Sequence, residues 1–222
     1  MILDDINRML EIVDSYQAPS RIMDILMGDD KQRLRIFNEF LVYFKHDMSY
    51  DWFHEYFEDE HADRKNKKQD FTPKCISSLV SQLMGSDTGV TYEPSSGTGG
   101  MLITNWYNQR SKIHPFNYDT NKHLIIAVEK SDKTIPFLLM NLSIRGISGI
   151  VFHGDTLKGE YKAMYVLTNE CNSIACIVNG AFFEVISETP VTKHLKHSVM
   201  VCVMLRLTCE YFYLVATVQF VT

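Results

Sequence analysis

The pattern of apolar and polar positions changes character near residue 60. Before that point apolar side chains recur every three or four residues, which is the spacing of one face of a helix. Two stripes stand out: Ile2, Ile6, Met9, Leu10 and Val13, and then Ile36, Phe37, Phe40, Leu41 and Phe44. Between them, Ser20 is a candidate helix N-cap and Gly28 a candidate helix stop. We therefore predict a small helical region over residues 1–62, whose apolar faces form core.

After the charged run DEHADRKNKK the pattern alternates between helices and strands. Helices are expected at 73–84, 101–112 and 131–146, and strands at 89–94, 123–129, 147–155 and 162–172. Such alternation indicates helical crossovers between parallel strands. The apolar segments 173–180, 181–187, 198–207 and 211–221 read as further strands. The fold class predicted for residues 63–222 is therefore α/β, with a mainly parallel sheet.

Three successive predicted strands end in a carboxylate. These residues are Glu93, Glu129 and Asp155, and the first of them leads into the glycine-rich sequence SSGTGG. In parallel sheets the carboxyl ends of the strands share one edge, where ligands bind. Glycines there let the backbone turn tightly and let a ligand approach the main chain. We therefore expect a ligand site at this edge.

The residues at this edge favour one kind of ligand. The loop has neither the Lys-Ser/Thr pair of a phosphate-binding P-loop nor the spacing of a dinucleotide-binding GxGxxG motif. Glu129 suits the two hydroxyl donors of a ribose, and Asp155 suits an exocyclic amino group of a purine. A ligand with an adenosine end and a zwitterionic or cationic end fits this order, and S-adenosylmethionine is such a ligand.

Four motifs in order, QDFTP, EPSSGTGGML, VEKSD…FLLMNLSIRGI and HGDTL, resemble the DNA adenine-N6 methyltransferases, and most closely the modification subunits of type I restriction systems. The resemblance covers residues 68–157 and implies a Rossmann-like class I methyltransferase sheet and S-adenosylmethionine as cofactor. It implies that the Thr-Pro turn covers the methionine end of the cofactor, and that the acid-glycine loop binds beneath it. The cofactor-binding residues implied are Phe71, Thr72, Pro73, Glu93, Pro94, Ser95, Gly97, Thr98, Gly99, Gly100, Glu129, Lys130, Asp155 and Thr156.

The same resemblance implies a catalytic motif at the end of the fourth strand. In the family this motif is Asn-Pro-Pro followed by an aromatic residue. The asparagine side chain and a neighbouring backbone carbonyl accept hydrogen bonds from the target amino group, and the aromatic ring stacks on a flipped base. The chain contains no Asn-Pro-Pro, and the matching position is Asn169, followed by Glu170, Cys171 and Asn172. Asn169 is therefore the candidate catalytic residue, with both prolines and the aromatic ring replaced.

Composition and charge restrict the partners. The formal net charge is −5, so contact with DNA would depend on local basic patches, of which Asp63–Lys68 (DRKNKK) is the densest. That run equally suits a solvated loop. The five cysteines form no CxxC pair, which favours free thiols in a reducing cytoplasm without a metal site. No apolar run is long enough for a membrane span.

Three functions remain open. The first is a compact DNA adenine-N6 methyltransferase with an atypical catalytic loop, of a size that suits a phage or mobile element, with DNA as its partner. The second is a catalytically degenerate protein that binds S-adenosylmethionine or acts as a partner of a restriction-modification subunit, which the missing Asn-Pro-Pro motif favours. The third is methylation of RNA, protein or a small molecule, because the fold does not determine its substrate.

Overall fold

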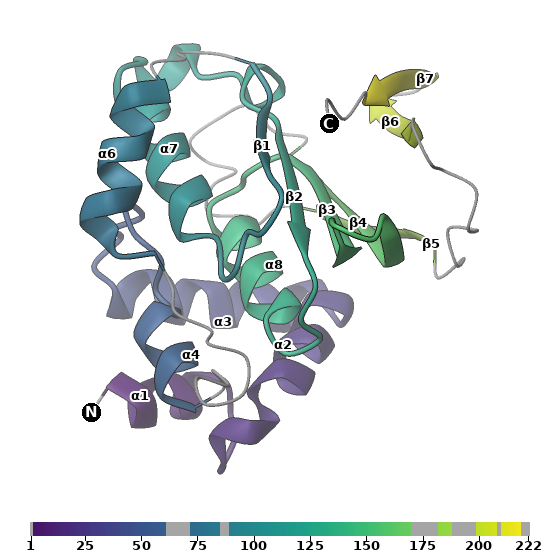
Figure 1. Cartoon of the computed structure of the whole chain (residues 1–222). Helices are drawn as coiled ribbons and strands as arrows, with labels where there is room; N and C mark the ends of the chain where they lie inside the picture. Colours follow the sequence, from purple (N-terminus) through teal and green to yellow (C-terminus); the bar gives the residue numbers. More distant parts are fainter. Residues whose placement is uncertain are drawn as a thin grey trace.

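The structure is a computed structural model that describes residues 2–60, 72–84, 89–169, 182–187, 199–207 and 210–218. Its N-terminal part contains α1 (Ile2–Met9), η1 (Ser15–Gln17), α2 (Ala18–Met27), α3 (Asp30–Tyr43) and α4 (His54–Glu60). The elements that follow are α6 (Lys74–Met84), β1 (Thr91–Glu93), α7 (Gly100–Ser111), η2 (Pro115–Asn117), η3 (Thr120–Lys122), β2 (Ile125–Glu129), α8 (Ile135–Ile144), β3 (Gly149–Asp155), β4 (Glu160–Thr168), β5 (Phe182–Ser187), β6 (Val199–Leu207) and β7 (Glu210–Val218) (Figure 1).

The predicted N-terminal helices are present, with two corrections at their ends. The helix α2 begins at Ala18 with a proline in its first turn, so Ser20 lies inside the helix and is not its N-cap. Gly28 ends the helix as predicted. The helix α1 ends at Met9, because Glu11 adopts the left-handed φ of 59°. Val13 therefore leaves the apolar stripe and is 88% exposed.

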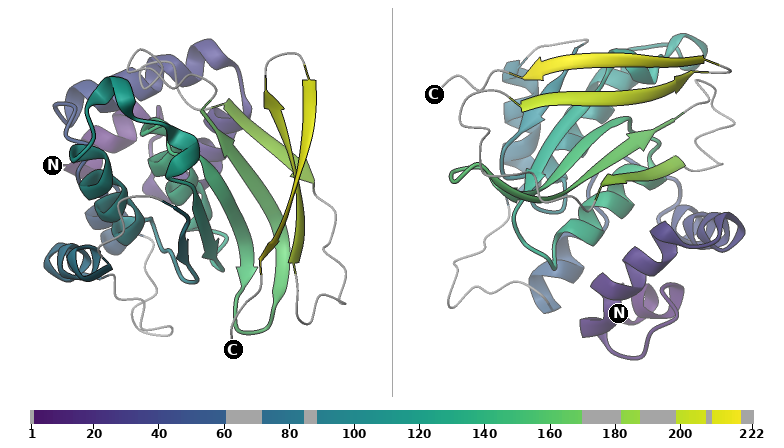
Figure 2. Two further views of the ribbon diagram at one scale, coloured as in Figure 1. Left: turned by 90° about the horizontal axis from the view of Figure 1, so that it is seen from above. Right: turned by 90° about the vertical axis from the view of Figure 1, so that its right-hand side faces the viewer.

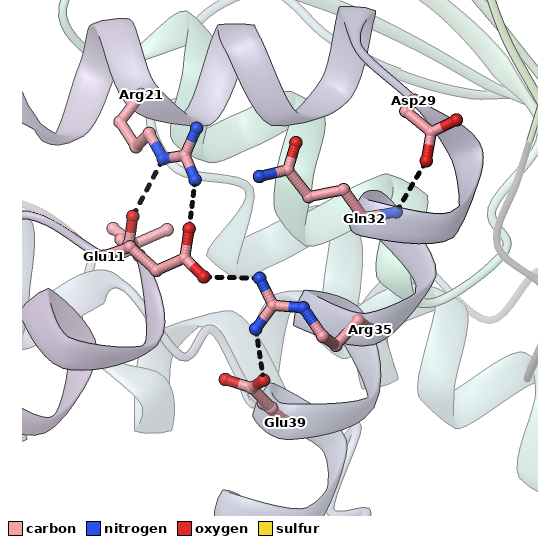
Figure 3. Close-up of polar contacts among 7 residues, drawn as sticks. Glu11, Arg21, Asp29, Gln32, Arg35 and Glu39 are labelled. Carbon is pink, nitrogen blue, oxygen red and sulfur yellow. Dashed lines mark hydrogen bonds and ion pairs between the residues drawn. The ribbon is translucent and has the colours of Figure 1, made fainter.

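Charged side chains join the turn after α1 to α2 and α3 (Figure 3). The Glu11 carboxylate accepts hydrogen bonds from Arg21, at 2.5 Å, and from Arg35, while Arg35 also bonds Glu39 at 2.8 Å. The Arg35 guanidinium holds the pKa of Glu11 below its usual range. Asp29 caps α3 by accepting the backbone N–H groups of Lys31 and Gln32. These contacts are exposed, so each stabilises the helices only slightly.

One continuous apolar core joins the N-terminal helices to the sheet. All ten residues of α8 are buried. The helix α8 contacts α2, and its apolar side chains belong to the same core cluster as residues of β2, β3 and β4. Around Phe137 of α8 the rings of Phe53, Tyr56 and Phe57 lie at 5.3, 5.8 and 5.4 Å between centroids. Figure 2 shows the helices gathered on one side of the sheet. The N-terminal helices thus complete the layer that covers one face of the sheet.

The sheet has the strand order β1-β2-β3-β4-β5. The pairs β1–β2 and β2–β3 are parallel, which confirms the crossovers predicted through α7 and α8. The pairs β3–β4 and β4–β5 are antiparallel, so the predicted parallel sheet extends only over β1, β2 and β3. Since the order follows the chain, the described strands include no reversal of strand order, and β1 lies at one edge.

A short turn explains the direction of β4. Only residues 156–159 separate β3 from β4, whereas a parallel pairing needs a crossover of roughly a dozen residues or more. The side chain of Asp155 accepts the N–H groups of Leu157 and Lys158, and Gly159 has a φ of 66° and donates to the Asp155 carbonyl at 2.9 Å. The sequence from Asp155 to Gly159 therefore forms a tight hairpin turn.

The C-terminal strands are described only by their backbone. The strand β5 falls within the predicted 181–187 segment, and β6 and β7 form a separate antiparallel pair, as the two predicted C-terminal strands. The predicted strand at 173–180 lies outside the described residues.

The strands β2 and β3 approach each other closely at Gly149, the first residue of β3. A Cβ atom at this position would lie 2.2 Å from the Ile125 carbonyl oxygen and 2.5 Å from Ile125 Cγ1. We expect Gly149→Ala to lower the free energy of unfolding by about 3 kcal/mol, since the backbone of β2 must shift. Gly159→Ala is the control, because its Cβ would meet open space and costs only about 1 kcal/mol of backbone strain at a φ of 66°. Urea denaturation measures both, and equal losses would contradict the expectation.

Candidate cofactor-binding site

The three predicted carboxylates end neighbouring parallel strands. Glu93 is the last residue of β1, Glu129 of β2 and Asp155 of β3. The register pairs Glu93 with Ala127 and Glu129 with His153, so the three acids step outward by two residues from one strand to the next. The predicted gathering of acids at one edge of the sheet is therefore present.

The glycine-rich loop is fastened to this edge by hydrogen bonds. Ser96 N donates to the Val128 carbonyl at 2.9 Å, and Gly97 N donates to Glu129 Oε2 at 2.9 Å. At the next strand, Thr156 Oγ1 donates to the Pro94 carbonyl at 2.6 Å. Pro94 and Ser95 are exposed on the loop. The loop thus lies across the ends of β2 and β3.

Two glycines give the loop its shape, and the helix α7 begins directly after it. Gly97 has a φ of 54°, and Gly99, the N-cap of α7, has a φ of 99°. A Cβ atom at Gly99 would lie 3.0 Å from Leu138 Cδ1, so a side chain there would be both strained and crowded. Gly100 opens the helix. The loop therefore requires glycine for conformation and for packing.

Glu93 is the most perturbed acid of the site. It is only 7% exposed, and its Oε2 atom has no hydrogen-bond partner among the described residues. Burial raises the pKa of this carboxyl to about 8, and the nearby Glu129 carboxylate acts in the same direction, while the Leu102 N–H acts against it. Glu93 also lines a mainly apolar hollow between α6, β1 and α7. A buried, unpaired acceptor is the feature that a ligand donor would satisfy.

The other two acids already have partners. Glu129 accepts Gly97 N and Ser131 N, the second at 2.8 Å, and burial raises the pKa of Glu129 against these bonds. Asp155 Oδ2 pairs with Lys130 Nζ at 2.8 Å, and this pairing holds the pKa of Asp155 below its usual range. An amino donor from a ligand would compete with Lys130, which is 70% exposed in its side chain.

The Thr-Pro turn lies just before α6. Thr72 and Pro73 are exposed, and the Pro73 carbonyl accepts Ile76 N in the first turn of the helix. The next residue, Lys74, places its ammonium 4.8 Å from the ring centroid of Tyr50. Phe71 lies outside the described residues.

Asn169 is not at this edge. Because β4 runs antiparallel to β3, its end lies beside the start of β3, with Leu167 paired to Gly149. Asn169 is buried there, where its side chain donates to the Gly146 carbonyl at 3.1 Å and its backbone N–H to Ser148 Oγ at 3.2 Å. The length of β3, about 20 Å, separates this position from Asp155. The structure therefore does not bring Asn169 together with the predicted cofactor residues.

A buried polar network behind the loop was not predicted. Thr98, one of the predicted cofactor-binding residues, is fully buried and donates its hydroxyl to Asp51, which lies between α3 and α4. Asn141 of α8 and Arg145, the C-cap of α8, complete the network. Burial raises the pKa of Asp51 and lowers that of Arg145 to about 10. One signal was in the sequence: Asn141 and Arg145 are four residues apart, at the end of a helix whose only other polar residue is Ser143.

The described residues fit the polar ends of S-adenosylmethionine. Glu93 Oε2 is an unpaired acceptor for an ammonium group, and the glycine loop leaves main-chain N–H groups at the start of α7. Within the same residues, no group of three or more His, Cys, Asp or Glu side chains is arranged to hold a metal ion. None of the helices in the described ranges has the length and apolar character needed to cross a membrane.

The chain has a glycine loop and acidic residues at the ends of parallel strands, in a fold of helices and a mixed sheet. These features define the class of α/β proteins that bind ligands at the carboxyl ends of parallel strands. Within that class the chain belongs to the N-6 DNA methylase family, which matches residues 46–182, more than half of the chain. This confirms the predicted resemblance. The match begins before the predicted boundary at residue 62.

The chain is also similar to the type I restriction enzyme HindI methylase subunit of Haemophilus influenzae. The two sequences are 31% identical over 96 residues, which are 42% of this chain and 21% of that protein. The matched stretch thus spans about one-fifth of the length of that curated relative. No solved structure gives a significant match.

Proposed function

We propose that the protein binds S-adenosylmethionine at the edge formed by the ends of β1, β2 and β3, and that it serves DNA adenine-N6 methylation. Membership of the N-6 DNA methylase family supports the reaction class. The observation that carries the cofactor proposal is Glu93, a buried carboxylate with an unpaired oxygen beside a glycine loop. When bound, the cofactor supplies the methyl group.

Each residue of the edge has a proposed task. Glu93 accepts the ammonium group of the methionine end, and the loop around Gly97 and Gly99 lets the ligand approach the main chain. Glu129 offers its remaining lone pairs to the ribose hydroxyls while it holds Gly97. Asp155 accepts the adenine amino group after Lys130 moves aside. The exposed turn Thr72–Pro73 covers the methionine end.

Isothermal titration calorimetry with S-adenosylmethionine tests the binding step. Methyl transfer is tested by incubating the protein with labelled cofactor and mixed-sequence DNA, alone and together with a modification and specificity complex of a type I restriction system. RNA and protein acceptors in parallel reactions address the other substrate classes. Absence of cofactor binding in the calorimeter at any pH from 6 to 8 would refute the proposal.

A second candidate is a protein that binds the cofactor without transferring the methyl group. It is favoured by Asn169, which lies at the end of the sheet opposite to Glu129 and Asp155 and has structural partners. A protein of this kind would act as a partner of a restriction-modification subunit. Cofactor binding without label transfer, together with a partner recovered by pull-down against a modification complex, would support this candidate over the first.

Asn169→Ala separates the two candidates. We expect it to lower the free energy of unfolding by about 1–2 kcal/mol, because it removes a buried donor from the Gly146 carbonyl. Cofactor affinity should stay within about twofold of wild type, since the site is a strand length away. Loss of a measured methyl transfer with unchanged affinity would instead make Asn169 catalytic. Thr168→Ala, one residue earlier on β4, is the matched control.

A further inference from the structure

Residues 47–53, which are part of the connection between α3 and α4, lie behind the candidate site and contact the elements that carry it. In this segment Asp51 bonds Thr98 of the glycine loop, and Tyr50 lies under the ammonium group of Lys74, next to the Thr-Pro turn. The same segment bonds α8 through Arg145. This segment thus contacts the glycine loop and the residue that follows the Thr-Pro turn.

Asp51 holds the glycine loop and is itself held by three hydrogen bonds to its carboxylate. Its Oδ2 atom accepts the Thr98 hydroxyl, and its Oδ1 atom accepts Phe53 N at 2.9 Å and Asn141 Nδ2 at 2.6 Å. Asn141 Nδ2 also donates to the Thr98 carbonyl at 2.8 Å. Both the side chain and the main chain of Thr98 are therefore fixed. Loss of one member leaves a buried polar group unpaired.

Arg145 fixes the segment that carries Asp51. Its guanidinium donates to the carbonyls of Met48, at 3.1 Å, and Tyr50, at 2.5 Å, and lies 4.4 Å from the ring centroid of Trp52. It also bonds the carbonyl and the side chain of Asn141, at 2.9 and 3.0 Å. Since α8 is buried over its whole length, the segment is held against a rigid element.

We propose that Asp51 is a positioning residue for the cofactor loop, acting through Thr98. Gly97 and Gly99 on either side of Thr98 have left-handed φ values and little conformational restriction of their own. A tether at Thr98 keeps the loop in the conformation that presents its main chain to the ligand, so that binding does not have to order it. Asp51 is buried behind the loop, where its carboxylate oxygens bond Thr98, Phe53 and Asn141, so in this proposal it acts on the ligand only through the loop. The inference rests on the proposed function, but the state of the loop can be measured without ligand.

The experiment compares Thr98→Val, which removes the hydroxyl, with Thr98→Ser, which keeps it, and includes Asp51→Asn. Tyr56→Phe is the control, because it removes a hydrogen bond to Asn7 of α1, at 2.6 Å, in which the loop takes no part. Native-state hydrogen exchange of residues 96–103 measures how readily the loop opens. Calorimetry with S-adenosylmethionine measures affinity, and thermal unfolding measures global stability. We expect Thr98→Val and Asp51→Asn to speed loop exchange and weaken binding by roughly tenfold each, and Thr98→Ser to stay within about twofold of wild type.

The outcomes separate the possible failures. Wild-type exchange of the loop in Thr98→Val would overturn the positioning role, and so would an equal change in Tyr56→Phe at the same loss of melting temperature. If the wild-type protein binds no S-adenosylmethionine, the proposed function fails while the exchange comparison still decides the role of Asp51. If Asp51→Asn does not fold, the Val and Ser variants at Thr98 decide it alone.

Discussion

We expect S-adenosylmethionine to bind the wild-type protein roughly 50-fold more tightly at pH 8 than at pH 6. The ligand ammonium group pairs with the ionised form of Glu93, and burial raises the pKa of that carboxyl to about 8. About one molecule in a hundred carries the ionised form at pH 6, and about half do at pH 8. Calorimetry across this range, in buffers of different ionisation enthalpy, also counts the proton that Glu93 releases.

Glu93→Gln is the decisive variant for this expectation. It keeps the shape of the side chain but cannot ionise, so affinity should be low and nearly constant from pH 6 to 8. Asp24→Asn, an exposed carboxyl on α2, is the control and should follow the wild-type pH dependence. An equal pH dependence in Glu93→Gln would show that another group titrates on binding, and would remove Glu93 from the site.

The ligand-free protein gives an independent reading of the same carboxyl. A folded-state pKa of about 8, above the ordinary 4.5, means that the folded protein retains a proton that the unfolded chain has released. The free energy of unfolding therefore falls as pH rises from 4.5 to about 8, by on the order of 4 kcal/mol. Glu93→Gln has no such titration, so its stability should not show this fall. The stability of the variant relative to the wild type should therefore be higher at pH 8 than at pH 5.

We expect Phe137→Ala to lower the free energy of unfolding by about 3–5 kcal/mol. Phe137 is fully buried, and its ring contacts Phe53, Tyr56 and Phe57 from the N-terminal helices. Truncation leaves a cavity between those helices and α8. Guanidinium denaturation measures the loss, with Phe116→Ala as a control because Phe116 is 84% exposed.

The same denaturation experiment tests whether the helices and the sheet unfold together. Trp52 lies in the N-terminal part and Trp106 on α7, so single-tryptophan variants report on the two parts separately. Because one apolar core contains both residues, we expect coincident transitions in the wild type and in Phe137→Ala. Separate transitions would instead make residues 1–62 an independent domain, with the boundary that the sequence pattern predicts.

Local signals in the sequence predicted most elements but not the direction of β4. The helices and the strands β1 to β3 follow from periodicity and from stops such as Gly28. The alternation of helices and strands predicted a mainly parallel sheet, and the family resemblance placed Asn169 at the end of the fourth strand. The sequence from Asp155 to Gly159 favours an antiparallel pairing instead, because Asp and Gly are typical residues of tight turns and too few residues lie between the strands for a crossover.

The site was predicted in part for a similar reason. Glu93, Glu129 and Asp155 could be found because each ends a strand, and parallel strands bring their ends together without knowledge of side-chain contacts. Asp51 could not be found in this way. Its partners Thr98 and Asn141 are 47 and 90 residues away along the chain, and no periodic pattern connects them.

These separations also bear on the order in which the molecule folds. The β3–β4 hairpin closes across four residues, so its contacts are local and form on the timescale of microseconds. The bonds from Arg145 to Met48 and from Asn141 to Asp51 close loops of 97 and 90 residues, whose entropic cost must be met first. We therefore expect the glycine loop to reach its final conformation only when the N-terminal helices have docked, so that the candidate cofactor site forms late in folding.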